Sequence, residues 1–460
     1  MIFKLKNNLI ILSVILLFFT FQNVIGQEKI SSGTLNLTVK ESVEIALKKS
    51  KKLLLAKSKI EEEYDGVGIS RTAFLPKIST VFNYTRLDYA PFFPAKAFMK
   101  FGGGGQLPPG QEMPKKITIG DENNYAAAFT VQQPIYTGGA LRNSYRISEL
   151  KAYNAEVNFE KSKNELVYDV EKAYWSVVKA QEFKKVAEEA IKQVNSHLKD
   201  LENMYQVGMV TENDLLMTKV QLSNAELALI QAKNGIKLAK IAFCNVLGIP
   251  LDTDVIFIDK LKAEPVPEIN LEKMIKTAFS KRPEINSFEA NIEIGRKAVN
   301  ISKAGYFPNI FLNADYGYRR PDRFYNRDFY GTWTVSMVFQ FNLFDWGETS
   351  LKVSRAKKQL KQIEITKKQL EDGITLEVTQ SYLSLLEAKE KIDKCRLNVK
   401  QAEENYRVTN EKFKEGLATN TNLLDANTLL VQARTNYISA LADYKVALAA
   451  LKKSTGEVKF

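Results

Sequence analysis

The chain has 460 residues, a formal net charge of +12, two cysteines and a single histidine, His197. So few histidines and cysteines argue against a metal site, and no glycine-rich phosphate loop with its lysine is present, so we expect neither an enzyme nor a cofactor-binding protein. The lysines are spread along helical stretches, which favours solvated helix faces over a nucleic-acid site.

The first 26 residues are predicted to be a secretory signal peptide. Lys4 and Lys6 precede an apolar run over 9–21, and modest or small residues follow up to Gly26. The run is short for a membrane span, so a membrane anchor is the less favoured interpretation. We therefore expect an exported chain.

A first structural unit is predicted over residues 27–247. Apolar residues at helical spacing and at alternating spacing separate helices from strands. Residues 88–123 hold five prolines and a run of four glycines without periodicity, which indicates a long loop. The predicted elements are a helix over 38–73, a strand over 76–87, a loop over 88–123, a strand over 124–134, a long helix over 140–206, a tip over 207–211 and a helix over 212–247.

A second unit over 271–460 repeats this order after a proline-containing connector over 248–270. The match is co-linear: Ile135-Tyr136 corresponds to Leu343-Phe344, and the segment around Gly208 corresponds to that around Gly416. The predicted elements are a helix over 271–305, a strand over 309–318, a loop over 319–330, a strand over 332–341, a long helix over 348–414, a tip over 415–419 and a helix over 420–453.

The two tips are predicted to be the turns of helical hairpins. Gly208 and Gly416 can take the left-handed conformation that ends a helix, and Thr211 and Thr419 can cap the helix that follows. Each long helix has about 67 residues and a length of ~100 Å, and each shorter helix has about half that length. Two short helices placed end to end match a long one, which predicts a rod of four helical columns.

The four strands alternate apolar and polar residues and have about the length needed to cross an outer membrane, ~9–11 residues. On the last strand, for example, Trp333, Val335 and Met337 alternate with Thr332 and Thr334. Four strands cannot close a pore, and open edges are costly in lipid, so the pattern predicts oligomerisation, with three copies supplying about 12 strands. The loops should face the cell exterior. The second loop carries a basic rim that would either meet anionic lipid headgroups or surface phosphates, or simply be solvated. Its residues are Arg319, Arg320, Arg323 and Arg327.

These features resemble the TolC family of outer-membrane efflux and secretion channels. The resemblance rests on the duplicated tips, on Pro76 and Pro308 at the helix-to-strand junctions, and on the segment that begins at Pro134. It implies a mostly α-helical fold with membrane β-strands, in which long hairpins with two strands each trimerise into a 12-stranded outer-membrane β-barrel and a periplasmic α-helical barrel. It also implies a homotrimer in outer-membrane lipid that docks onto a periplasmic adaptor (membrane fusion protein) and an inner-membrane RND or ABC pump.

The resemblance also implies roles for residues near the tips. The expected entrance residues are Asp214, Asn422 and Asp425, although Asn422 stands where the family has an acid. Asp425 has an alternative role, solvating or capping the first turn of its helix. The expected adaptor-contacting residues are Gly208, Thr211, Leu215, Gly416, Thr419 and Leu423.

Two other classes of protein remain as alternatives. A long coiled-coil envelope scaffold would show the heptads but not the four strands, and a periplasmic adaptor without a pore would have one hairpin rather than two. Efflux of small amphiphiles and type I protein secretion are not separated by the sequence. We expect His197 to be an ordinary helix residue, and Cys244 and Cys395 to be buried thiols too far apart for a disulfide.

Overall fold

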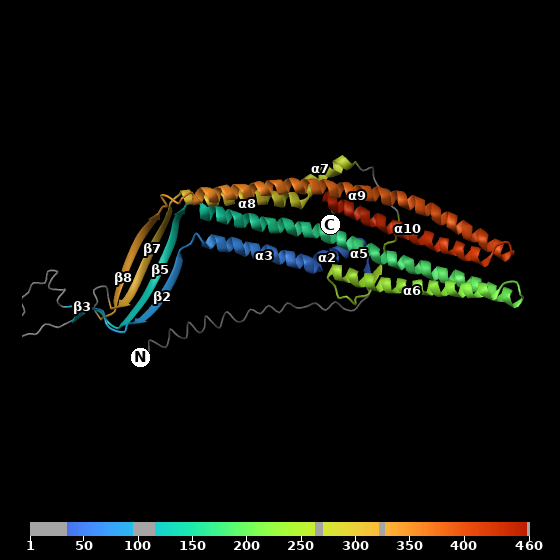
Figure 1. The fold of residues 1–460 in the computed structure, drawn as a ribbon, viewed down its shortest axis with the longest axis horizontal. Helices are drawn as coiled ribbons and strands as arrows, with labels where there is room; N and C mark the ends of the chain where they lie inside the picture. Colours follow the sequence, from blue (N-terminus) through green and yellow to red (C-terminus); the bar gives the residue numbers. More distant parts are fainter. Residues whose placement is uncertain (1–34, 95–115, 263–269, 322–326, 458–460) are drawn as a thin grey trace, which may run out of the picture.

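The computed structural model describes residues 35–94, 116–262, 270–321 and 327–457. The predicted signal peptide lies outside the described residues, as do the glycine run of the first loop and Arg323 of the second. Within the described ranges the molecule is elongated, with helices at one end and a β-sheet at the other (Figure 1). No helix among these residues combines the length and the apolar composition that crossing a membrane requires.

Two long helices set the length of the molecule. Helix α5 spans Ala140–Gln206 and helix α9 spans Glu348–Lys414, and both have 67 residues. Their bounds coincide with the predicted ones, and their length is ~100 Å. Each ends in a tight turn, after which α6 (Glu212–Leu247) folds back along α5 and α10 (Asn420–Thr455) folds back along α9.

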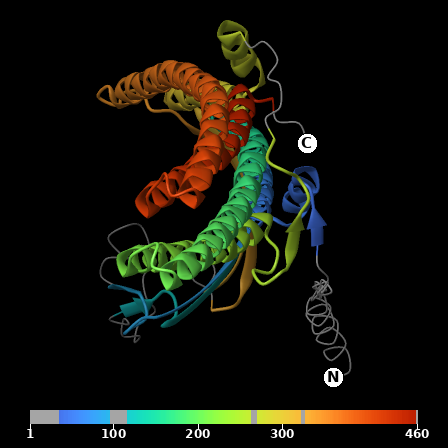
Figure 2. The same ribbon diagram turned by 90° about the vertical axis from the view of Figure 1, so that its right-hand side faces the viewer.

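The shorter helices line up end to end into columns. Helix α3 (Lys51–Thr72) and α6 both pack against α5, while α8 (Pro283–Lys303) and α10 both pack between α5 and α9. The column order is therefore α3 with α6, then α5, then α8 with α10, then α9. Seen from the tips, these columns form one curved layer rather than a closed bundle (Figure 2). The columns α3/α6 and α9 are its two edges.

The helices predicted over 38–73 and 271–305 are each broken in two, which corrects the sequence interpretation. Helix α2 (Val39–Lys49) ends at Ser50, whose ψ of 125° is extended, and α7 (Leu271–Lys281) ends at Arg282, whose ψ is also 125°. Pro283 accounts for the second break, because a proline disfavours helical geometry in the residue before it. At the first break the C-terminal glycine of α6, Gly248, packs against Lys49 and Ser50.

The second break is fixed by a buried arginine. The guanidinium of Arg282 donates to Glu377 at 2.6 Å, to Glu284 at 3.0 Å and to the carbonyl oxygen of Ser454 at 3.4 Å. These contacts join α8, α9 and the end of α10. Gly456, which ends α10, packs against Lys281 at the same place. The end of α6 therefore docks at the break between α2 and α3, and the end of α10 docks at the break between α7 and α8.

The connector contains a strand that the sequence interpretation missed. Strand β6 (Val255–Phe257) pairs in parallel with β1 (Leu35–Leu37). The hydroxyl of Tyr174 donates to the carbonyl oxygen of Leu37 at 2.9 Å and accepts from the amide of Asp259 at 3.0 Å. Burial raises the pKa of Tyr174 to about 12. Three-residue strands are too short to give a periodic signal, so this pairing was invisible in the sequence.

The main sheet has four antiparallel strands in the order β2–β5–β7–β8. The strands are β2 (Lys77–Arg86), β5 (Asn123–Thr137), β7 (Asn309–Arg320) and β8 (Tyr330–Gln340). Strand β5 continues past Pro134, where we predicted its end, because a bulge there accommodates the missing N–H. Strands β7 and β8 also extend into the predicted loop 319–330. The described part of the loop 88–123 contains two short strands, β3 (Phe92–Pro94) and β4 (Lys116–Thr118), which pair antiparallel, rather than only irregular chain.

Both cysteines are free and buried, as predicted.

Candidate functional site

The two tips have the geometry that the sequence predicts. Gly208 and Gly416 have φ values of 75° and 74°. The amide that follows each glycine donates back into the helix, from Met209 to Met204 at 2.9 Å and from Leu417 to Lys412 at 2.7 Å. These bonds satisfy carbonyl groups that the end of a helix would otherwise leave unpaired.

Asp214 and Asn422 complete capping boxes, and their role at the entrance stays a prediction. Asp214 accepts from the amide of Thr211 at 3.0 Å and from its hydroxyl at 2.7 Å. Asn422 accepts from the amide of Thr419 at 3.0 Å and from its hydroxyl at 2.6 Å. Both residues occupy the third helical position, where a side chain reaches back to the cap. Their oxygens are therefore engaged by their own helix ends.

Asp425 lies one turn further along α10 and is exposed. It takes no part in the capping box. Of the three predicted entrance residues, it is the one whose carboxylate is free of the helix end.

Leu215 and Leu423, which the resemblance predicted to contact an adaptor, are buried and do not offer a contact surface in this structure. They pack with Leu201 and Phe413 into an apolar cluster between the two hairpins. The side chains that the tips do expose flank the turn glycines. These exposed apolar tip residues are Val207, Met209 and Leu417. Sequence reasoning missed them because an apolar residue beside a glycine gives no periodic signal.

A buried polar network joins the tips of the two hairpins. Nε2 of His197 on α5 lies 2.7 Å from Oδ1 of Asn420, the first residue of α10. The side-chain nitrogen of Asn420, Nδ2, donates to the carbonyl oxygen of Asp214 at 3.0 Å. The hydroxyl of Thr218 on α6 lies 3.3 Å from both polar atoms of the Asn420 side chain. The ring of His197 also packs edge-on against Phe413. His197 is therefore a hairpin-joining residue rather than the ordinary helix residue that we expected.

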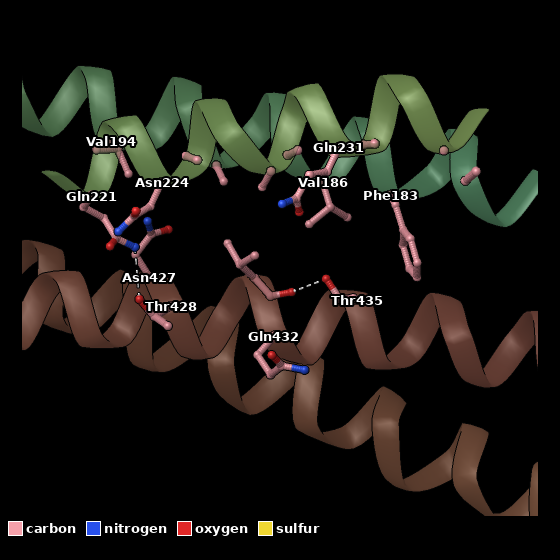
Figure 3. Close-up of a pocket in the computed structure, with 18 residues that line it drawn as sticks. Phe183, Val186, Val194, Gln221, Asn224, Gln231, Asn427, Thr428, Gln432 and Thr435 are labelled. Atoms are coloured by element: carbon pink, nitrogen blue, oxygen red, sulfur yellow. Dashed lines mark hydrogen bonds between the residues drawn. The ribbon is translucent and has the colours of Figure 1, made fainter. Parts of the chain in front are cut away.

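A groove separates the hairpins beyond this network, between α5 and α6 on one side and α10 on the other (Figure 3). Its volume is ≈ 510 Å³, and alanines and neutral amide side chains dominate its lining. Gln221 crosses one end and donates to Thr428 at 3.2 Å. Oδ1 of Asn427 is buried there without a hydrogen-bond partner.

The main sheet has two unlike faces. Register places Phe82, Phe129, Tyr316 and Trp333 on one face, which is apolar and exposed. The opposite face carries mostly small and polar groups, among them Asp315, whose Oδ1 accepts from the hydroxyl of Thr130 at 2.7 Å. This alternation is typical of strands that separate lipid from water.

The junction of the sheet with the helices is marked by prolines and exposed aromatic residues. Pro76 stands between α3 and β2, and Pro308 stands before β7, whereas Pro134 lies within β5 at the bulge. Phe344 and Trp346 lie between β8 and α9, are strongly exposed, and pack edge-on with centroids 4.9 Å apart. At the loop end Tyr318 stacks on Phe329 and Tyr84 packs against Tyr125. Aromatic residues therefore lie at both ends of the apolar face.

Known proteins share this sequence pattern. A family model described as "Outer membrane efflux protein" matches residues 43–248 and 274–457. The alkaline protease secretion protein AprF of Pseudomonas aeruginosa is 23% identical over 313 residues, which cover 66% of this chain and 64% of that protein. The probable efflux pump outer membrane protein TtgC of Pseudomonas putida is 22% identical over 352 residues, covering 74% of this chain and 70% of TtgC.

Solved structures share the fold. The CmeC outer membrane channel of Campylobacter jejuni matches with a TM-score of 0.73 at 17% identity, over 91% of this chain and 85% of CmeC. The outer membrane protein VceC of Vibrio cholerae matches with a TM-score of 0.71 at 16% identity, over 91% of this chain and 96% of VceC.

Proposed function

The chain belongs to the outer membrane efflux protein family, and on that premise we propose that three copies of it form an export channel of the outer membrane. In this proposal the sheets of the three copies join into a 12-stranded barrel, and the helices continue it as a tunnel through the periplasm. The channel is the exit duct of a tripartite efflux or type I secretion system. A coiled-coil scaffold or a periplasmic adaptor is no longer favoured.

The main observation behind the proposal is the four-stranded sheet with one apolar face and two unpaired edges. The apolar face, with aromatic residues at both ends, has the composition of a surface in contact with lipid tails and headgroups. The strand edges β2 and β8 have no partner within the described chain. An unpaired edge in lipid leaves backbone N–H and C=O groups without hydrogen bonds, which costs several kcal/mol for each group.

The helical edges support the same assembly. The column α3/α6 lies on the side of β2, and α9 lies on the side of β8 (Figure 1). Both helical edges expose apolar side chains at helical spacing. On α6 they are Leu216, Val220, Leu227, Ile230 and Leu238, and on α9 they are Leu376, Leu383 and Leu397. Packing α3/α6 of one copy against α9 of the next would cover both stripes while β2 pairs with β8.

The tips are proposed to dock onto a periplasmic adaptor, which connects the channel to an inner-membrane RND or ABC pump. The exposed apolar tip residues offer the contact surface, and the ring of three Asp425 side chains lines the entrance. In this proposal the side chains of Asp214 and Asn422 stabilise the turns by capping α6 and α10. The relatives described above include a secretion protein and an efflux pump component, so a common export role is the best-supported function.

Native mass spectrometry of the detergent-solubilised protein tests the assembly. We expect a mass of three chains, and a stable, fully folded monomer would contradict the proposal. Deleting the gene then tests the export role: loss of resistance to small amphiphiles would identify efflux, and loss of a protein from the culture medium would identify secretion. A deletion strain unchanged in both respects would contradict an export role.

A further inference from the structure

Asp315 is unusual among the residues of the main sheet because it is the one acidic residue in the strands β2, β5, β7 and β8. It lies near the middle of β7, opposite Thr130 on β5 and Thr334 on β8. It therefore faces the polar side of the sheet, away from Tyr316 and Trp333.

The surroundings of Asp315 are neutral and hydrogen-bonding. The hydroxyl of Thr130 donates to its Oδ1 at 2.7 Å, which orients the carboxylate. Along β7, Asn313 and Gly317 occupy the neighbouring positions on the same face. No lysine or arginine within salt-bridge distance of Asp315 is found in the described chain. The carboxylate is thus an uncompensated negative charge on the polar face.

Positive charge on this face lies at the two ends of the sheet. Lys77 begins β2 at the helix end, and Arg319 lies near the loop end of β7. The guanidinium of Arg319 folds over Gly317, since a Cβ on that glycine would lie 3.4 Å from its Nε. Along the polar face the charges therefore alternate from positive to negative to positive.

We propose that Asp315 sets the charge preference of the strand-lined part of the channel, by attracting cations and cation-bearing solutes. The proposal rests on the trimeric channel above, in which three copies of Asp315 lie at one level of the pore wall. Carboxylates at one level repel each other and attract a cation passing between them. Arg319, closer to the loops, attracts anions instead. Solutes with a net negative charge are therefore attracted to the wall at Arg319 and repelled from it at Asp315.

Ion selectivity in planar bilayers tests this assignment. Reversal potentials are measured in a KCl gradient below 0.1 M, where the Debye length exceeds ~10 Å and wall charges act across more of the pore. Asp315→Asn removes the charge but keeps an oxygen that accepts from Thr130. We expect the ratio of K⁺ to Cl⁻ permeability to fall by about twofold or more at low salt and the change to shrink at 1 M salt. Asp315→Glu, which keeps the charge, should retain the wild-type ratio.

Arg319→Gln is the matched variant of opposite sign, and it should raise the same ratio. A shift of Arg319→Gln in the same direction as Asp315→Asn would mean that the barrel has changed shape, which would overturn the assignment. Native mass spectrometry of each variant confirms that the trimer is intact. If the wild-type protein inserts and carries no ion current, the proposed channel itself fails. If the wild type conducts and Asp315→Asn keeps its permeability ratio, only the role of Asp315 fails.

Chemical modification gives an independent readout. Because Cys244 and Cys395 are buried, Asp315→Cys would be the accessible thiol among the described residues. A negatively charged methanethiosulfonate reagent should restore the preference for cations, and a positively charged one should move the channel further toward anions. Equal effects of the two reagents, or no reaction in the open trimer, would show that residue 315 does not line the pore.

Discussion

His197 joins the two hairpins through one ring nitrogen. Burial lowers the pKa of His197 from its usual 6.5, since a charged ring would lose hydration there, and the bond to Asn420 and the charge of Asp200 only partly oppose this. The titratable and charged groups around the ring are Glu189, Lys192 and Asp200 on α5, and Tyr406 and Lys414 on α9. The neutral ring donates from Nε2 to the side-chain oxygen of Asn420.

The tip end should therefore lose stability in mild acid. The pKa of His197 is lower in the folded than in the unfolded chain, so its contribution is fully present above pH ~6.5 and is lost as the pH falls through the folded pKa. We expect the melting temperature to fall between pH 7 and pH 5 by less in His197→Gln, which cannot titrate, than in the wild type. Circular dichroism of the detergent-solubilised protein measures this. Equal losses in both proteins would mean that His197 does not contribute to the pH dependence.

Asp425 is the residue that we predict to line the pore at the entrance. If it lines the pore, Asp425→Ala should weaken cation selectivity and reduce block by multivalent cations added on the tip side, with the trimer intact. Asp214→Ala provides the comparison, because its carboxylate caps α6, and its loss should cost about 1 kcal/mol of stability with little effect on block. Unchanged block in Asp425→Ala would place Asp425 on the outer wall of the tunnel.

The residues at the tips show which assignments a sequence supports. Gly208 and Thr211 were predicted correctly because a helix end and an N-cap are decided within a few consecutive residues. Leu215 was assigned wrongly, because whether it faces a partner or its own chain depends on how the two hairpins pack. The contact between His197 and Asn420 joins residues 223 positions apart, and no local pattern announces it.

Two glycines that end helices, Gly208 and Gly248, share a left-handed conformation but differ in what surrounds them. Gly208 and Gly248 have nearly equal φ values, 75° and 74°. A Cβ at Gly208 meets no atom within 4 Å, whereas one at Gly248 would collide with the carbonyl oxygen of Lys49. We expect Gly208→Ala to cost ~1 kcal/mol through left-handed strain alone. Gly248→Ala should cost about 1–3 kcal/mol more, because the junction of α6 with α2 and α3 must shift.

Thermal unfolding of both glycine variants in the same detergent checks this order. The trimer should persist in Gly208→Ala. A melting temperature for Gly248→Ala equal to that of Gly208→Ala would mean that the junction of α6 with α2 and α3 can shift without a loss of stability.

The bounds of some helices were predicted correctly, whereas the breaks in others were missed. The difference is whether neighbouring residues in the sequence or contacts with distant residues determine where a helix ends. The bounds of α5 and α9 followed from an unbroken pattern between glycines and capping threonines. The breaks at Ser50 and Arg282 did not, since helical periodicity continues on both sides of each and the break is set by contact with the end of another helix. Pro283 was the one local signal, and it was available in the sequence.

The whole molecule has two edges that the described part of its chain leaves uncovered. The curved layer of columns and the four-stranded sheet share these edges, because β2 continues into the α3/α6 side and β8 into α9 (Figures 1 and 2). The exposed apolar side chains of the α3/α6 column and those of α9 should therefore meet between copies. A charge placed in either stripe would be buried against apolar side chains in the trimer and exposed in the monomer.

Charge in a stripe should thus separate the copies without unfolding them. We expect Leu227→Glu on α6, and independently Leu383→Glu on α9, to move the protein toward monomers in native mass spectrometry while its helix content stays the same. Leu429→Glu is the matched control: Leu429 is exposed to a similar extent, 59% against 57% for Leu227, but it lies on α10, in an inner column. That variant should remain trimeric. Dissociation of all three variants alike would mean that any charge on the helices weakens the assembly. Intact trimers in both edge variants would place the contact between copies elsewhere on the tunnel wall.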